Sequence, residues 1–223
     1  YTDGYPHDIQ LAVGLPPAHY QSLCKKFKAY LMRPEIIDFT HNGRTYSIEI
    51  TDVQCFPQAF AAAMTRYNTE MGKRATVIDL GGYTADYIQI VDGKPLIEHS
   101  DSLENGVIHL YHRIMQEINC IMDTRLKESD IDLIIRGNPH YPEQLIKIVD
   151  QQVRQYLDDF IGQLRERQID LRVGQTVIIG GGGILLRKYI EQNPWIQHIT
   201  FIDDIRANAH GYQPVSYTHL RAH

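Results

Sequence analysis

Apolar residues follow two kinds of spacing along the 223-residue chain, and each predicts its own kind of element. Short alternating or continuous apolar runs are typical of strands, whereas apolar residues that recur every three or four positions are typical of helices. Strands are expected over residues 9–15, 36–40, 45–56, 75–80, 85–91, 95–99, 131–135, 173–179 and 199–202. Helices are expected over residues 19–32, 58–71, 103–121, 142–167 and 184–190, with another beginning at residue 206. Strands that alternate with long helices predict an α/β protein with mixed sheets.

Turn residues sharpen two of these boundaries. Asn42-Gly43 separates two alternating runs, which predicts a tight hairpin because both residues accept positive φ. Pro57 is expected to begin the helix that follows the second run, since proline is tolerated in the first helical turn.

Composition narrows the class of protein. Hydrophobic residues make up 43% of the chain, which indicates a globular core. The formal net charge of −5 argues against sequence-independent binding of nucleic acid, which needs a basic surface. Cys24, Cys55 and Cys120 are far apart and lack metal-ligand spacing, as expected for reduced thiols in a cytoplasmic protein. No apolar run approaches the roughly 20 residues that cross a bilayer, so we expect no membrane partner.

The segment from Asp79 to Asp86 reads Asp-Leu-Gly-Gly-Tyr-Thr-Ala-Asp between two apolar strands. Gly81 and Gly82 allow backbone N–H groups to approach an anion, and Thr84 adds a hydroxyl donor. Asp79, at the end of a strand, is placed to hold a hydrated Mg²⁺, because this cation prefers oxygen ligands and keeps several waters. Two glycines alone fit an ordinary hairpin, but this combination of side chains favours a phosphate-binding turn.

A second glycine-rich segment, Gly180 to Gly183, follows a predicted strand and opens a helix. Such a turn can lay backbone against a nucleotide, or it can serve close packing alone. The segment is not a GxGxxG fingerprint followed by an acidic ribose ligand, and the chain has no GxxxxGK[ST] motif. These observations argue against a dinucleotide-binding protein and a P-loop protein.

Together the two segments resemble the superfamily of actin, sugar kinases and heat-shock chaperone ATPases. Within it the chain is most similar to the bacterial plasmid-segregation branch, ParM/StbA, over roughly residues 5 to 213. Three further stretches carry this resemblance in order: Gln10 to Pro17, Val53 to Phe60, and Asp101 to Val107. The implied fold is an actin-like (ribonuclease H-like) two-domain ATPase with mixed sheets flanked by helices.

The resemblance also implies a domain organisation. Residues 1–74 are expected to be the remainder of the first domain, to which residues 200–213 return, and residues 75–199 the second domain. The superfamily's earlier phosphate hairpin, of the Asp-x-Gly type, cannot be supplied before Ile9, so the chain is expected to be truncated at its N-terminus. Residues 214–223 fit no periodic pattern and are expected to be a non-native or disordered tail.

Individual residues acquire roles from the same resemblance. Gln58 would orient the attacking water, and Asp79 would bind Mg²⁺ through water. The other residues would surround ATP or ADP: Gly81, Gly82, Tyr83 and Thr84 at the β- and γ-phosphates, Gly181, Gly182 and Gly183 at the adenosine, and Asp101 and Gly106 near the ribose and base. Tyr83 departs from the usual Thr or Gly, so it would contribute backbone only. Asp101 equally fits a helix N-cap, and Gly106 a packing glycine.

The implied activity is Mg-ATP hydrolysis by an ATPase that forms filaments with itself for plasmid or DNA segregation, with a DNA-binding centromere adaptor protein as partner. Domain closure around Mg-ATP would align Gln58, a water and the γ-phosphate, so that catalysis rests on positioning. Two other interpretations stay open: a nucleotide-binding scaffold or regulator without turnover, and a small-molecule kinase. Gln58, where a kinase would place an aspartate, favours water as the nucleophile.

Overall fold

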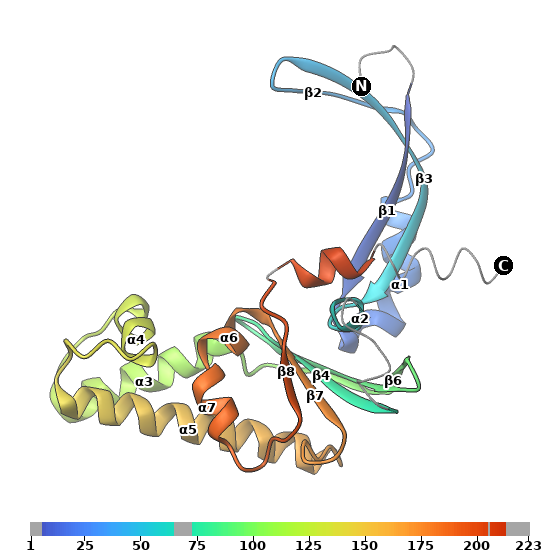
Figure 1. Cartoon of the computed structure of the whole chain (residues 1–223). Coiled ribbons are helices and arrows are strands. Elements are labelled where there is room, and N and C mark those ends of the chain that lie inside the picture. Colours follow the sequence, from blue (N-terminus) through green and yellow to red (C-terminus); the bar gives the residue numbers. More distant parts are fainter. Residues whose placement is uncertain (1–5, 65–72, 205, 213–223) are drawn as a thin grey trace. The chain divides into compact units, whose positions relative to one another are not determined.

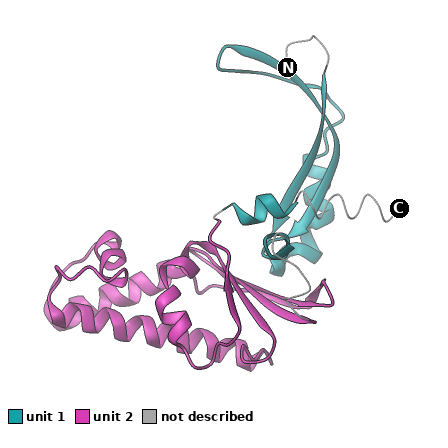
Figure 2. Cartoon of the chain, in the orientation of Figure 1, with its two compact units in different colours: residues 1–66, 206–223 teal, residues 67–205 magenta. Residues whose placement is uncertain are grey.

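The computed structural model describes residues 6–64, 73–204 and 206–212. The predicted tail and the last part of the helix that was expected to reach residue 71 lie outside these ranges. The chain divides into two compact units (Figure 2). Unit 1 contains residues 1–66 and 206–223, and unit 2 contains residues 67–205.

Unit 1 is built on a three-stranded sheet with the strand order β1-β3-β2 (Figure 1). β1 (His7–Leu15) runs parallel to β3 (Arg44–Pro57), and β2 (Ile37–His41) pairs with β3 in the antiparallel sense. Asn42 and Gly43 form the turn between β2 and β3 with φ values of 51° and 73°. The predicted hairpin is therefore confirmed, and its turn uses the backbone conformation that this dipeptide favours.

The helix α1 (Pro17–Leu31) crosses from β1 to the hairpin and packs on β3. The Tyr20 hydroxyl donates a hydrogen bond to the Cys55 carbonyl oxygen at 3.2 Å, which ties the helix to the strand. Cys24 lies one helical turn after Tyr20, and it is partly buried whereas Cys55 is fully buried.

The prediction that Pro57 begins a helix is wrong, because Pro57 is the last residue of β3. The Gln58 N–H group donates to the Leu15 carbonyl oxygen at 2.8 Å, which continues the pairing with β1 past the proline. Ala59 then adopts a left-handed conformation with φ 65°, and only after it does α2 (Phe60–Met64) begin. The buried end of the strand thus outweighs the helix-starting tendency of the proline.

The segment 207–212 is helical and completes unit 1. The Asn208 side-chain oxygen accepts the Ala59 N–H at 2.8 Å, and the Tyr212 ring stacks on Phe56 with centroids 5.7 Å apart. Residues far apart in the sequence therefore share one core here, which is why unit 1 is made of two separate segments.

Unit 2 contains a five-stranded sheet with the strand order β6-β5-β4-β7-β8. Its strands are β4 (Arg74–Leu80), β5 (Ala85–Val91), β6 (Lys94–Leu103), β7 (Gln175–Ile179) and β8 (Ile199–Phe201). β4 pairs antiparallel with β5 on one side and parallel with β7 on the other. The carboxyl ends of β4 and β7 consequently lie next to each other at one edge of the sheet.

The chain returns to unit 1 later than expected. β8 pairs in parallel with β7, so residues 199–201 belong to the sheet of unit 2, and the return begins at Arg206 rather than at residue 200.

Helices form the core of unit 2 together with this sheet (Figure 1). They are α3 (Val107–Met122), α4 (Glu128–Ile135), α5 (Glu143–Glu166), α6 (Gly180–Leu185) and α7 (Arg187–Gln192). α5 confirms the predicted long helix, with Pro142 at its N-cap. Its buried residues, spaced by three and four, meet those of α3 and the strands, and each such side chain contributes roughly 1.5–3 kcal/mol of burial.

Three predicted elements of unit 2 differ in the structure. The helix expected over residues 184–190 is divided into α6, which begins earlier, and α7. Residues 131–135, expected as a strand, lie in α4, because Ile131, Ile134 and Ile135 are buried on one helical face. The helix expected from residue 103 begins at Val107, because β6 continues its pairing with β5 as far as Leu103. Among the described residues, no helix combines the length and apolar character needed to cross a membrane.

Candidate functional site

The turn Gly81–Thr84 joins the end of β4 to the start of β5. Gly81 donates its N–H to the Thr84 carbonyl oxygen at 2.9 Å, which closes the loop. The ladder below it is regular, with Leu80 opposite Ala85. Tyr83 is 81% exposed, so its side chain takes no part in the core of unit 2.

Three successive peptide units of this turn are held by the start of α3. The carbonyl oxygens of Gly81, Gly82 and Tyr83 accept hydrogen bonds from the backbone of Val107, Ile108 and Gly106, at 3.1, 2.9 and 3.0 Å respectively. The first N–H groups of a helix have no partner inside the helix, so the turn supplies acceptors that α3 would otherwise lack. The turn and the helix therefore fix each other.

The same bonds decide where the N–H groups of the turn point. A trans peptide directs its C=O and its N–H to opposite sides, and none of the described peptide bonds is cis. With their carbonyls engaged by α3, these three peptides turn the N–H groups of Gly82, Tyr83 and Thr84 away from the helix. Among the backbone–backbone hydrogen bonds of the described residues, none has one of these three N–H groups as its donor. Successive N–H groups that point away from the helix can together bind an anion.

Asp79 and Asp86 stand directly opposite each other at the ends of β4 and β5. Side chains at opposed positions share one face of the sheet, with Cβ atoms about 4.5–5.5 Å apart. Asp86 is only 5% exposed. The pair fits a hydrated divalent cation, which takes one or two carboxylates and fills its shell with water and phosphate oxygens.

Asp86 belongs to the sequence motif, but the motif alone did not predict a role for it. Its register opposite Asp79 brings it to the site. Within the described ranges, no three His, Cys, Asp or Glu side chains gather as a metal-binding group. A cation held here by Asp79 and Asp86 would therefore complete its shell with water and phosphate oxygens.

The four glycines after β7 differ from one another. Gly180 has φ 85° and lies beside the Asp79 carboxylate, whereas Gly181 is exposed and has open space where a side chain would stand. Gly182 and Gly183 are buried, and an added Cβ would come within 2.7 Å of the Leu80 carbonyl oxygen and 2.5 Å of an Ile178 methyl group, respectively. Of the three glycines assigned to the adenosine, Gly181 is the one with room for a ligand, while the other two serve close packing.

Gly106 and Asp101, both predicted near the ribose and base, occupy different structural positions. Gly106 is the N-cap of α3, and a Cβ there would lie 2.3 Å from the Gly82 carbonyl oxygen, so only glycine allows this approach. Asp101 is not a helix N-cap, because it lies within β6 opposite Tyr87 and its Oδ1 accepts the Ser102 N–H at 2.9 Å. Burial first, and then the Asp101 charge, raise the pKa of Tyr87.

Gln58 belongs to unit 1 and follows directly on the end of β3. Its backbone is fixed on both sides, by the bond from its N–H to Leu15 and by the acceptance of the Phe60 N–H at 2.7 Å. Its side chain is partly exposed and passes close to Gly14, where an added Cβ would stand 3.0 Å from Gln58 Cγ. The carboxyl ends of parallel strands, where Gln58 lies, are common positions for ligand-binding residues in α/β sheets.

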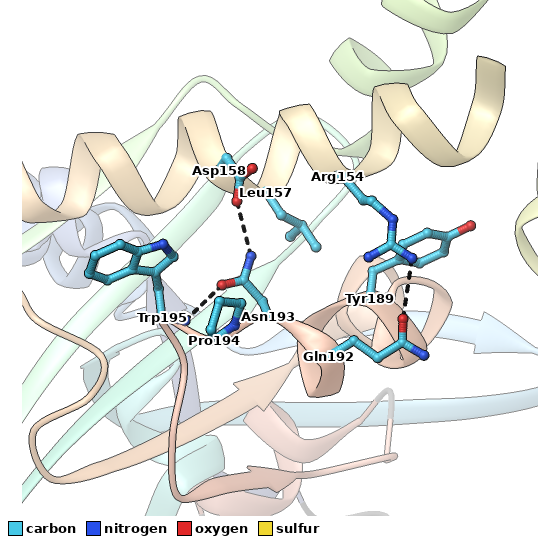
Figure 3. Close-up of a pocket in the computed structure, with 8 residues that line it drawn as sticks. All are labelled: Arg154, Leu157, Asp158, Tyr189, Gln192, Asn193, Pro194 and Trp195. Atoms are coloured by element: carbon cyan, nitrogen blue, oxygen red, sulfur yellow. Dashed lines mark hydrogen bonds between the residues drawn. The ribbon is translucent and has the colours of Figure 1, made fainter. Parts of the chain in front are cut away.

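A hollow of about 200 Å³ lies elsewhere in unit 2, between α5 and the segment after α7 (Figure 3). Asn193 donates to Asp158 at 3.1 Å and accepts the Trp195 N–H at 2.9 Å, while Arg154 donates to Gln192 at 3.3 Å. These polar groups satisfy one another across the hollow. The arrangement fastens the 192–195 segment to α5 and presents no set of convergent groups for a ligand.

Two family descriptions match the chain. "Actin like proteins N terminal domain" matches residues 2–60, and "Archaeal actin homologue MreB-like, C-terminal" matches residues 77–192. No curated protein matches the sequence significantly.

Solved structures show the same fold over nearly the whole chain. The archaeal actin homolog Ta0583 superposes with a TM-score of 0.74 at 21% identity, covering 97% of this chain and 71% of its own; it has also been solved in complex with ADP. The Alp12 filament structure gives a TM-score of 0.73 at 17% identity, covering 98% and 70%. The apo pSK41 ParM protein gives 0.69 at 13% identity, covering 99% and 67%.

These likenesses confirm the predicted actin-like α/β fold with mixed sheets flanked by helices. They do not single out the ParM/StbA branch, because an archaeal actin homolog and ParM both superpose at low identity. The second match extends over residues 77–192, which is more than half of the chain, and contains the Asp79–Asp86 hairpin and the glycine run. The chain therefore belongs to the family of archaeal MreB-like actin homologues.

Proposed function

We propose that this chain binds Mg-ATP through the β4–β5 turn and acts as an actin-like ATPase. One observation carries the proposal: the N–H groups of Gly82, Tyr83 and Thr84 point away from α3, because the carbonyls of the same peptide units accept hydrogen bonds from the start of that helix. The β- and γ-phosphates are anions that such a set of donors suits. The ADP complex of Ta0583, which shares the fold, supports a nucleotide as the ligand.

Asp79 and Asp86 would hold the magnesium ion beside the phosphates, Asp79 through water. The ion, when bound, neutralises charge on the phosphate oxygens. Gly181 would face the adenosine, and Gly106 contributes by allowing α3 to approach the turn. Asp101 has the weakest support as a nucleotide ligand, because its carboxylate already accepts the Ser102 N–H.

Gln58 would orient the water that attacks the γ-phosphate. An amide can accept a hydrogen bond from water and donate another, so it fixes the position of the nucleophile without acting as a strong base. Catalysis then rests on positioning and on charge stabilisation by the turn. A small-molecule kinase is disfavoured, because its reaction would need a stronger base at this position.

Self-assembly into filaments for DNA segregation, with a DNA-binding centromere adaptor, is the further part of the proposal. The Alp12 filament and the ParM structures, which share this fold, support it.

The test is Mg-ATP binding, phosphate release and light scattering on the wild-type chain and on Asp79→Asn. The variant keeps the size of the side chain but loses its charge, and should weaken Mg-dependent ATP binding by roughly 10- to 100-fold. Asp92→Asn, at the exposed turn at the opposite end of β5, is the matched control and should behave as the wild type.

Each alternative has its own outcome. Nucleotide binding without phosphate release would favour a scaffold, and turnover without light scattering would favour a monomeric ATPase. A wild-type chain that binds no ATP in the presence of magnesium would contradict the proposal.

A further inference from the structure

Tyr156 is a buried polar residue with a single clear partner. It lies in the middle of α5 and is fully buried, and its hydroxyl donates to the Asn105 carbonyl oxygen at 2.6 Å, across 51 positions of sequence. Burial raises the pKa of Tyr156 well above its ordinary value, so the phenol keeps its proton and remains a donor. A buried hydroxyl normally has such a partner, but the identity of this one is informative.

The accepting carbonyl belongs to the peptide that links Asn105 to Gly106. The N–H of that same peptide donates to the Tyr83 carbonyl oxygen at 3.0 Å. The peptide is therefore held from both sides, by Tyr156 on its oxygen and by the turn on its nitrogen.

The chain of bonds continues into the candidate site. The Tyr83 carbonyl is part of the peptide whose other end is the Thr84 N–H, one of the three outward donors. Two peptide units thus connect the Tyr156 hydroxyl to a donor of the turn. Hydrogen bonds in such a chain polarise one another, so each strengthens the next.

We propose that Tyr156 is a positioning residue for phosphate binding, which acts through the Asn105–Gly106 peptide on the Thr84 N–H. This inference rests on the proposed function of the turn. Tyr156 touches no ligand itself. It orders the turn before the ligand arrives, and preorganisation of donors raises affinity because less ordering remains to be done on binding.

The experiment compares Tyr156→Phe with the wild-type chain, using the Kd of the non-hydrolysable analogue adenylyl imidodiphosphate with magnesium and the Kd of AMP. Only the first ligand has β- and γ-phosphates. Loss of the hydroxyl should raise its Kd by roughly three- to tenfold, the effect of one buried hydrogen bond, and leave the Kd of AMP unchanged.

Tyr111→Phe is the matched control. Tyr111 is also buried in the core of unit 2, and its hydroxyl donates to Asp132, away from the turn. This variant loses the same atom and should show the wild-type Kd for both ligands.

Amide hydrogen exchange gives a second readout that needs no nucleotide. Exchange at Gly106 should be faster in Tyr156→Phe than in Tyr111→Phe when the two are compared at equal thermal stability.

Three results would overturn the inference. They are that Tyr156→Phe leaves both Kd values unchanged, that it weakens the binding of both ligands equally, or that it matches Tyr111→Phe in every measurement. In each case a wild-type chain that still binds the analogue leaves the proposed function intact. A wild-type chain that binds neither ligand overturns the inference together with the proposed function.

Discussion

The Asp79 carboxylate lies against the backbone of Gly180, so close that a Cβ on Gly180 would stand 2.5 Å from Asp79 Oδ1. The contact follows from the register of the parallel strands, which places Asp79 opposite Ile179, the last residue of β7, and so brings the residue after it beside the carboxylate. Gly180 also has φ 85°, a conformation that other residues rarely adopt. The glycine run after β7 therefore also helps to fix the position of the Asp79 carboxylate.

Gly180→Ala should therefore destabilise unit 2 and displace Asp79. The left-handed backbone costs an alanine about 1–2 kcal/mol, and the clash with the carboxylate and the Leu80 carbonyl adds to it. Gly181→Ala is the matched control for stability, since nothing lies within 4 Å of its added Cβ and its φ is not positive. Urea unfolding of both variants measures the difference. Equal stability of the two would contradict the close contact between Asp79 and Gly180.

Gln58→Ala should lower the rate of ATP hydrolysis by about 100-fold while ATP binding stays near the wild-type level, because the loss concerns the position of the water. Gln54→Ala, four residues earlier and within β3, controls for the loss of an amide side chain near this end of the strand. Phosphate release and the Kd of ATP are the two measurements. Wild-type turnover by Gln58→Ala would contradict the role given to this residue.

The thiols should differ strongly in reactivity. Burial first, and then neighbouring Cys24, raise the pKa of Cys55 from 9.0 to about 12, which lowers its thiolate fraction near pH 8 about 1000-fold. Cys55 should therefore resist alkylation in the native chain and become reactive in urea, whereas the exposed Cys120 should react first. Pulse alkylation followed by peptide mass spectrometry gives the order. Comparable labelling of Cys55 and Cys120 without urea would be inconsistent with the packing of α1 on β3.

Stability should fall at high pH, in part through Tyr189. Burial first, and then Asp150, raise the pKa of Tyr189 from 10.0 to about 12. Below pH 10 the phenol is protonated in both states. Between pH 10 and 12 the unfolded chain releases this proton and the folded chain retains it, so unfolding becomes more favourable as the pH rises. In urea titrations at pH 9, 10 and 11, Tyr189→Phe should lose stability less steeply than the wild type. Identical slopes would rule out this contribution.

Elements with strong local signals could be predicted from the sequence. Asn42-Gly43 determines its own turn, and the apolar spacing of α5 extends over many turns of helix. Residues 131–135 could not be assigned in this way, because five residues are too few to separate two periodicities. The start of α4 is instead secured by Asp130, whose carboxylate accepts the Lys127 N–H at 2.9 Å.

The candidate site was likewise predictable only where its residues are contiguous in sequence. The β4–β5 turn was predictable because its motif is contiguous. The position of Asp101 was not, since it depends on how far β6 follows β5. The sequence could not predict the contact of Tyr156 with the start of α3, because its partner is distant in sequence and the bond is to a backbone carbonyl.

The two-segment construction of unit 1 has a consequence for how the chain is made. Asn208 and Tyr212 supply contacts to Ala59 and Phe56, yet they are synthesised about 150 residues later. A growing chain folds in the order in which its units become complete. Unit 2 is contiguous, so its residues have all been made before the last part of unit 1 leaves the ribosome. The part of unit 1 that precedes unit 2 therefore reaches its final packing only after the residues of unit 2 have been made.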